Sequence, residues 1–427
     1  MFKTLRNAFS LPELRKKILY VIFIIVLYRI GAAIPIPYIN ASMMDTIKGL
    51  GNGSILQYMS ILSGTAFSRA TLFALSISPY INASIIIQLL CTAIPALENM
   101  AKEEDGRNKI TQITRYVTVG LALITAYGYY MMLRNYGLII NKSVFSAIVI
   151  IACYTAGSCL IMWLGEKINE NGIGNGISII LFVNIVSSIP SVFSMLISYF
   201  KNGIGGIITA IVTIIIAVFM VVFIIFMTNS ERRLPIQYAK RVVGRKMYGG
   251  QSSTLPLKLN MAGVMPIIFA NSILALPSTI AMFFPTPKEG TFWYGFQRLF
   301  SYTSWLYAVV FMVLIVFFSY FYIAISFNPI EVSNNLKKNG GFIPGIRPGK
   351  PTADYITKVL NKVTLMGAFF LGVIAVLPLA ANIISGNRIS GIAFAGTSII
   401  IVVGVALETA REIEAQMTMR HYKGFLE

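Results

Sequence analysis

Ten long apolar stretches constrain the fold of this chain more than any other feature of its sequence. Each is close to the roughly 20 residues that a helix needs to cross the hydrocarbon core of a bilayer. They lie at about 18–36, 70–94, 113–133, 144–164, 176–199, 207–228, 263–284, 304–327, 363–382 and 392–410. A β-barrel would instead show alternating strands of about ten residues. The sequence therefore predicts an all-α polytopic membrane protein with ten transmembrane helices.

The composition excludes an ordinary soluble domain. The chain has 427 residues, of which 56% are hydrophobic and 12% are charged, and its mean hydropathy is +0.73. Soluble proteins carry about 25% charged residues, so most of this surface must face lipid. The basic residues of 3–17 could indicate a cleaved secretory signal, but nine further apolar stretches follow the first one, which favours an uncleaved first span.

The distribution of Lys and Arg between alternate loops predicts the orientation. Loops on the side of the N-terminus hold 25 of the 35 Lys and Arg residues, whereas the opposite loops hold eight. Cytoplasmic loops of membrane proteins are enriched in these residues, so we expect both termini to be cytoplasmic. Anionic lipid headgroups attract such loops as well, by about 1 kcal/mol for each basic residue.

A short polar segment at 201–206 divides the predicted spans into five and five. If the two halves arose by duplication, an odd number of spans in each places them in opposite orientations, as in the inverted repeats of many transporters. We therefore expect an N-terminal half at 1–203 and a C-terminal half at 204–427, the latter with cytoplasmic loops at 229–262 and 328–362. No repeat is visible in the sequence itself, and an ordinary surface loop is the alternative for 201–206.

Side chains that usually carry chemistry or ion coupling are scarce in the predicted spans. Only Arg29 lies well inside an apolar window, and the single histidine, His421, lies in the polar C-terminal tail. Cys91, Cys153 and Cys159 form no CxxC pair. We therefore expect neither an enzyme nor a proton-coupled relay, and no catalytic residue, metal or cofactor. A pathway lined by Ile, Leu and Val instead suits a constriction that blocks ions by dewetting.

The segment 37–69 is long for a loop and contains an apolar piece, 55–62, that is too short to span. Half-spanning backbone survives at membrane depth only when it is buried in protein or faces a water-filled cavity. The sequence therefore predicts a re-entrant element here, with a surface amphipathic helix as the alternative.

Eight short stretches carry a resemblance to one protein family. They lie at 78–90, 162–166, 172–178, 237–241, 255–264, 334–338, 344–349 and 396–398. In their order and spacing they resemble the SecY family, the pore subunit of the Sec protein-translocation channel, over essentially the whole chain. The resemblance implies a clamshell of two five-helix halves around a central hourglass pore in a bacterial plasma membrane. Such a channel moves signal-bearing unfolded polypeptides across the membrane and releases transmembrane segments laterally into lipid.

The resemblance also implies how the pore is closed. A ring of apolar side chains at its waist would be formed by Ile81, Ile85, Leu181, Ile268 and Ile401. A short plug helix at 54–68 would fill the external funnel of the closed channel. Its apolar side chains would be Ile55, Leu56, Tyr58, Met59, Ile61 and Leu62.

By the same resemblance, a lateral gate lies between the second and third spans on one side and the seventh and eighth on the other. Its candidate residues are Ile86, Ile87, Gln88, Leu90, Asn271 and Ser272. Polar groups within these apolar helices would pair across the seam.

The two basic loops are the expected docking sites for partners. Their candidate contact residues are Arg232, Arg233, Lys240, Arg241, Arg245, Lys246, Lys337, Lys338, Arg347 and Lys350. Such patches attract the phosphates of ribosomal RNA, and a motor protein docks by charge complementarity. The resemblance implies the SecA ATPase, a translating ribosome, SecE and usually SecG as partners. Two other functions remain open: a secondary transporter of a small solute, and an accessory translocase with few substrates.

Overall fold

The computed structural model describes residues 8–40, 66, 69–201, 203–238, 241–243, 246–248, 252–284, 295, 300, 304–384 and 395–423. The helices of this part are α2 (Pro12–Gly31), α6 (Ser78–Ala93), α7 (Pro95–Lys102), α8 (Glu104–Asn135), α9 (Val144–Asn171), α10 (Gly176–Lys201), α11 (Gly203–Asn229), α12 (Met265–Ala281), α14 (Trp305–Ser326), α15 (Pro329–Lys338), α16 (Lys350–Ile384) and α18 (Ala395–Lys423). The strands are β1 (Glu231–Tyr238), β2 (Arg241–Val243), β3 (Lys246–Tyr248), β4 (Ser252–Lys258) and β5 (Gly341–Phe342).

Each of the ten predicted spans overlaps one helix of 16 residues or more. These helices are, in order, α2, α6, α8, α9, α10, α11, α12, α14, α16 and α18. Within the described residues, α8, α9, α10, α11, α16 and the segment Trp305–Lys338, which comprises α14 and α15, are long and apolar enough to cross a membrane. The bent pair of α6 and α7 passes the same test. The prediction of a mostly helical polytopic protein is therefore confirmed.

Several helices continue beyond the apolar windows that predicted them. The apolar window at 363–382 corresponds to α16, but this helix already begins at Lys350. At its start, the hydroxyl of Thr352 donates a hydrogen bond to the carbonyl oxygen of Arg347 at 2.9 Å. Much of the predicted loop 328–362 is therefore helical, as α15 and the first turns of α16. A hydropathy window detects the part of a helix that crosses hydrocarbon, and polar residues can continue the same helix outside it.

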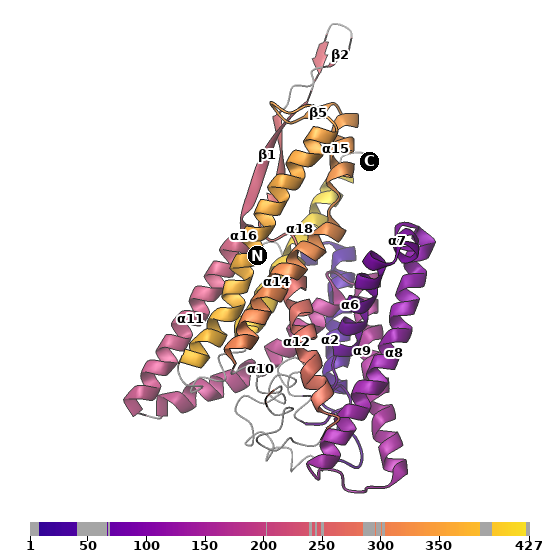
Figure 1. Cartoon of the computed structure of the whole chain (residues 1–427), viewed down its shortest axis with the longest axis vertical. Coiled ribbons are helices and arrows are strands. Elements are labelled where there is room, and N and C mark those ends of the chain that lie inside the picture. Colours follow the sequence, from indigo (N-terminus) through magenta and orange to yellow (C-terminus); the bar gives the residue numbers. More distant parts are fainter. Residues whose placement is uncertain are drawn as a thin grey trace.

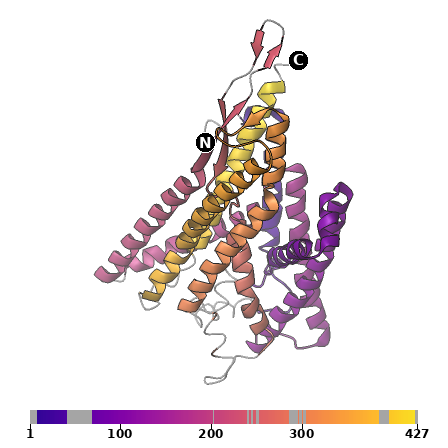
Figure 2. The ribbon, with the colours of Figure 1, turned by 45° about the horizontal axis from the view of Figure 1, so that its top comes forward.

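The basic loop 229–262 forms β structure, which the expectation of an all-α protein did not include. Strand β1 pairs antiparallel with β4, from Glu231 opposite Lys258 to Gln237 opposite Ser252, and β5 pairs with the other edge of β1. Strands β2 and β3 form a separate two-stranded sheet farther along the same hairpin. Figure 2 shows this hairpin extending beyond the ends of the helices.

The chain just before α6 is not helical, although it falls in the predicted window 70–94. Residues 69–77 form turns, and Ala70 and Ser76 adopt positive φ angles of 48° and 51°. The segment fits between two helices, because a Cβ at Gly31 would lie 2.1 Å from the ring of Phe73 and a Cβ at Gly157 would lie 2.1 Å from a backbone oxygen of the segment. Irregular backbone of this kind is tolerated within a membrane when protein surrounds it.

Buried hydrogen bonds hold the same segment in place. The hydroxyl of Tyr28 on α2 donates to Oδ1 of Asn184 on α10 at 2.5 Å, and Nδ2 of Asn184 donates to the hydroxyl of Ser76 at 3.0 Å. The hydroxyl of Ser158 on α9 donates to the Ser76 carbonyl at 3.4 Å. Three helices thus fix the position at which α6 begins.

The two longest predicted basic loops lie near each other. In Figure 1, β5, α15 and the C-terminal end lie toward the top, α7 lies at the top of the right-hand group of helices, and the turn between α8 and α9 lies at the lower end. The chain reverses between α10 and α11 at Gly203, which has a φ of +80°. This reversal lies at the predicted boundary between the halves 1–203 and 204–427, and the division itself stays a prediction.

Candidate pore constriction, lateral gate and docking surface

The five predicted ring residues lie in one buried apolar cluster. Ile81 and Ile85 lie one turn apart on α6, Leu181 lies on α10, Ile268 on α12 and Ile401 on α18. Their exposed fractions range from 2% to 6%. The structure thus brings side chains from both predicted halves into one buried apolar cluster, and their arrangement as a pore constriction stays a prediction.

The start of α10, which carries one of these side chains, is fixed by two asparagines. Oδ1 of Asn175 accepts hydrogen bonds from the N–H groups of Ile177 at 3.0 Å and Ser178 at 3.3 Å, and Oδ1 of Asn169 accepts from Gly176 at 2.7 Å. A Cβ at Gly176 would lie 2.0 Å from a backbone oxygen of α9. This glycine therefore allows α9 and α10 to pack closely.

The predicted plug residues lie outside the described part of the chain. This applies to Ile55, Leu56, Tyr58, Met59, Ile61 and Leu62. Within 54–68 the structure describes only Ala66, whose carbonyl oxygen accepts hydrogen bonds from the backbone N–H and the hydroxyl of Thr71 at 3.1 and 3.2 Å. The plug stays a prediction.

The predicted gate residues of α6 divide between two environments. Ile87 is buried, whereas Ile86 and Leu90 are 41% and 38% exposed. Gln88 donates a hydrogen bond to the hydroxyl of Ser84 at 3.3 Å, one turn away on the same helix. This hydrogen bond lies within α6, and the pairing of Gln88 across the seam stays a prediction.

Of the two predicted gate residues on α12, Ser272 lies at the junction with α6 and α8. Asn271 is 5% exposed. Ser272 lines a cavity of about 30 Å³ together with Asn82 of α6, Thr125 of α8 and Thr279 of α12. Polar side chains from three helices therefore line one cavity at this seam. The sequence did not predict this, because these residues are far apart in the chain.

Six of the predicted docking residues are described and exposed. They are Arg232 and Arg233 on β1, Lys337 and Lys338 at the end of α15, and Arg347 and Lys350 before and at the start of α16. Arg233 contacts Glu231 at 2.7 Å on the same strand. Arg241 and Lys246 lie on β2 and β3, and Lys240 and Arg245 lie outside the described residues.

The turn that carries Arg347 has a fixed backbone. Gly345 and Gly349 adopt φ angles of +81° and +101°, which favour glycine. The hydroxyl of Ser333 on α15 donates to the Gly349 carbonyl at 2.7 Å. The guanidinium of Arg347 is thus carried on a rigid turn, which suits specific contact with a partner.

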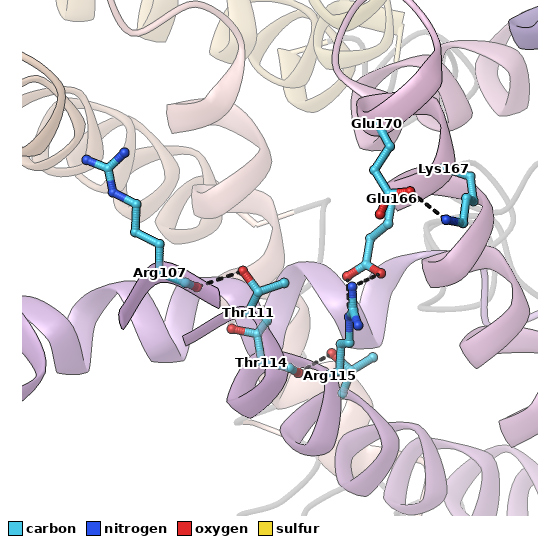
Figure 3. A network of polar contacts seen from close by, with 8 residues as sticks. Arg107, Thr111, Thr114, Arg115, Glu166, Lys167 and Glu170 are labelled. Atoms are coloured by element: carbon cyan, nitrogen blue, oxygen red, sulfur yellow. Dashed lines mark hydrogen bonds and ion pairs between the residues drawn. The ribbon is translucent and has the colours of Figure 1, made fainter. Parts of the chain in front are cut away.

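An ion pair between α8 and α9 was not predicted from the sequence. Nε of Arg115 donates to Oε1 of Glu166 at 3.0 Å, and Nη2 lies 2.9 Å from Oε2, so two nearly parallel contacts join the helices (Figure 3). The Glu166 side chain is 12% exposed and that of Arg115 is 44% exposed. Glu166 belongs to one of the eight stretches, but a partner 51 residues away leaves no local pattern.

The described residues contain no group of three His, Cys, Asp or Glu side chains arranged to hold a metal ion. Together, these features define a class: a polytopic helical membrane protein with a large buried apolar cluster and exposed basic side chains on β1, α15 and the start of α16.

A sequence profile of the SecY family matches residues 71–410 of the chain. The chain is 44% identical over 441 residues to the protein translocase subunit SecY of Streptomyces galbus, and 42% identical over 445 residues to that of Mycobacterium tuberculosis strain H37Rv. Both alignments cover 100% of each chain. The chain belongs to the SecY family.

The fold is that of solved protein-conducting channels. One such channel superposes with a TM-score of 0.66 at 17% identity, and covers 94% of this chain and 92% of its own. Sec61 in the canine ribosome–channel complex superposes with a TM-score of 0.62 at 16% identity and the same coverage. The chain is therefore a subunit of a protein-conducting channel, and the predicted fold and family are confirmed. The names of these two relatives describe a translocase subunit and no catalytic activity.

Proposed function

We propose that this chain forms the general protein-export pore of a bacterial plasma membrane, and that exported polypeptides pass through the ring of Ile81, Ile85, Leu181, Ile268 and Ile401. The observation that carries the proposal is the burial of these side chains in one apolar cluster. An apolar ring makes no sequence-specific polar contacts, so polypeptides of any sequence can pass through it. The lateral gate between α6 and α8 on one side and α12 and α14 on the other releases transmembrane segments into lipid.

The energy for transport comes from partners, because the chain itself is not an enzyme. The exposed basic side chains of β1, α15 and the Arg347 turn support docking of the SecA ATPase or a translating ribosome at this end. A solved Sec61 structure is described as part of a ribosome–channel complex, which agrees with this proposal. SecE and SecG are expected as membrane partners, and anionic lipids as ligands of the remaining basic residues.

The same end of the molecule is proposed to be cytoplasmic. The two longest predicted basic segments, which form β1, β5, α15 and the start of α16, lie toward the top in Figure 1, and Lys and Arg accumulate on the cytoplasmic side of membrane proteins. Both termini would then be cytoplasmic.

Photo-crosslinking at the ring tests this function. A photoreactive residue at position 401 is expected to capture a stalled secretory chain and not a stalled cytosolic chain of equal length. The same probe at Val222, which is 62% exposed on α11, is the control and should capture neither chain. Consistent absence of crosslinks from position 401, with the partners and the stalled chains verified, would exclude passage through the ring.

Arg347→Glu is expected to reduce SecA-driven export at least tenfold. The rigid turn presents Arg347 at a defined place, and charge reversal there opposes docking of a complementary partner. The assay is translocation of a signal-bearing reporter into vesicles that hold the variant channel with SecA and ATP. Lys142→Glu, an equal reversal at an exposed residue between α8 and α9, is the control. Equal rates for the two variants would contradict the assignment of Arg347 as a docking residue.

A further inference from the structure

A cavity outside the predicted ring and gate lies where α18 meets the connection between β4 and α12. Its volume is about 180 Å³. Its walls carry three charged side chains, Lys258, Glu408 and Arg411, beside Gly263 and Val264. None of the residues assigned above to the ring, the gate or the docking surface lines it.

Glu408 fits closely against the start of α12. Gly263 adopts a φ of +63°, and a Cβ at this position would lie 2.2 Å from Oε1 of Glu408. The backbone N–H of Val264 donates a hydrogen bond to the Glu408 carboxylate. One turn earlier on α18, a Cβ at Gly404 would lie 2.3 Å from Cγ2 of Val264. The two glycines let α18 approach the connection, and the carboxylate occupies the space that a side chain at 263 would need.

Val264 connects this carboxylate to the predicted ring. Its N–H group donates to Glu408, and its carbonyl oxygen accepts the N–H of Ile268 at 3.3 Å, in the first turn of α12. On α18, Ile401 lies seven residues before Glu408, which is two turns along the same face of the helix. The approach of α18 to residues 263–264 therefore joins the carboxylate to the connection that leads into α12, and each of these two helices carries one predicted ring side chain.

Two cations, Lys258 and Arg411, line the same cavity as Glu408. Lys258 is the last residue of β4, at the base of the basic hairpin. Nη2 of Arg411 donates to the Thr228 carbonyl at 2.8 Å and to Oδ1 of Asn229 at 2.7 Å, both at the end of α11. Both cations attract the carboxylate. The hairpin, α11, α12 and α18 thus meet at Glu408.

We propose that Glu408 is a positioning residue that holds the start of α12 against α18 and so keeps the ring side chains of Ile268 and Ile401 together in the closed channel. This inference rests on the proposed passage of polypeptides through the ring. Loss of the hydrogen bond to Val264 frees the first turn of α12, and the ring then closes less tightly.

The test compares export of two reporters, one with an intact signal sequence and one with a defective signal sequence, in cells that depend on the variant channel. Glu408→Ala is expected to raise the ratio of defective-signal to intact-signal export at least fivefold. Glu408→Gln, which keeps an oxygen acceptor for Val264, is expected to stay within twofold of the unaltered channel. A purely structural defect would lower both exports together and leave the ratio unchanged.

Glu412→Ala is the matched control, because Glu412 is exposed one turn later on α18 and its removal changes the net charge equally. An equal ratio for Glu408→Ala and Glu412→Ala would overturn the inference, while export of the intact-signal reporter by the unaltered channel would still support the proposed function. Failure of the unaltered channel to export even the intact-signal reporter would instead overturn the proposed function.

A second variant keeps the test decisive if Glu408→Ala does not accumulate in the membrane. Gly263→Ala places a Cβ where Oε1 of Glu408 lies and is expected to raise the same ratio. A ratio for Gly263→Ala that equals the unaltered one would overturn the inference.

Discussion

Replacement of Ile401 with asparagine is expected to let the channel export a reporter whose signal sequence is defective, at ten times the background rate or more. Ile401 is 2% exposed in the apolar cluster that contains the other ring residues. A buried amide without a hydrogen-bond partner costs about 1–3 kcal/mol, and it also attracts water into a constriction that depends on dewetting. Both effects favour the open channel. Ile85→Gly, which removes an entire ring side chain, should act in the same direction.

The measurement is export of the defective-signal reporter, normalised to the amount of channel in the membrane. Val222→Asn on α11 is the control, because it places the same amide on an exposed part of a span and should leave signal dependence unchanged. If Ile401→Asn and Val222→Asn gave the same export at equal channel levels, the ring would not be the seal.

Gly157→Ala is expected to destabilise the folded channel by about 2 kcal/mol, since overpacking costs about 1–3 kcal/mol. The added Cβ would lie 2.1 Å from the backbone oxygen of Leu72. Neither side can easily move, because the segment 69–77 is held by buried hydrogen bonds to α2, α9 and α10. A backbone that shifts here would also displace Ser76 and the start of α6.

Gly120→Ala is the matched control for this prediction. Gly120 lies in α8, with no atom of the described structure within 4 Å of the position of an added Cβ, so alanine there should be neutral or stabilising by up to about 1 kcal/mol. Unfolding of the two purified variants in detergent gives the comparison. Similar unfolding midpoints for both variants would contradict the prediction, because they would show that the segment 69–77 shifts to make room for the added methyl group.

The number and order of the long helices could be predicted from the sequence, because a bilayer requires each span to be apolar for its whole length. The same signal could not distinguish a helix from a buried non-helical segment. Residues 70–77 are as apolar as a span but form turns, since Pro79 favours a helix start and Gly31 and Gly157 leave room for irregular backbone between two helices.

The β hairpin was missed for a different reason. Pro235 on β1 and Pro256 on β4 disfavour central strands, and the loop therefore looks irregular in sequence. The structure pairs these strands because Leu234, Ile236 and Leu257 are buried beside α15, α16 and β5.

The candidate site could be predicted only through family resemblance. A buried isoleucine of a pore ring has the same local pattern as any core isoleucine, so periodicity alone does not select Ile81 or Ile401. The Arg115–Glu166 pair and the contact between Glu408 and Val264 join residues that are distant in the chain, and they became visible only once the helices were placed.

The angle between α6 and α7 limits how α6 can move. The two helices are bent by 105° at Ile94, so α7, with its 8 residues, forms a side arm about 12 Å long. A Cβ at Gly106, at the start of α8, would lie 1.9 Å from the backbone oxygen of Met100 on α7. A rotation of α6 about its own axis therefore displaces α7, and α7 in turn displaces the first turn of α8. We expect α6 and the start of α8 to move together.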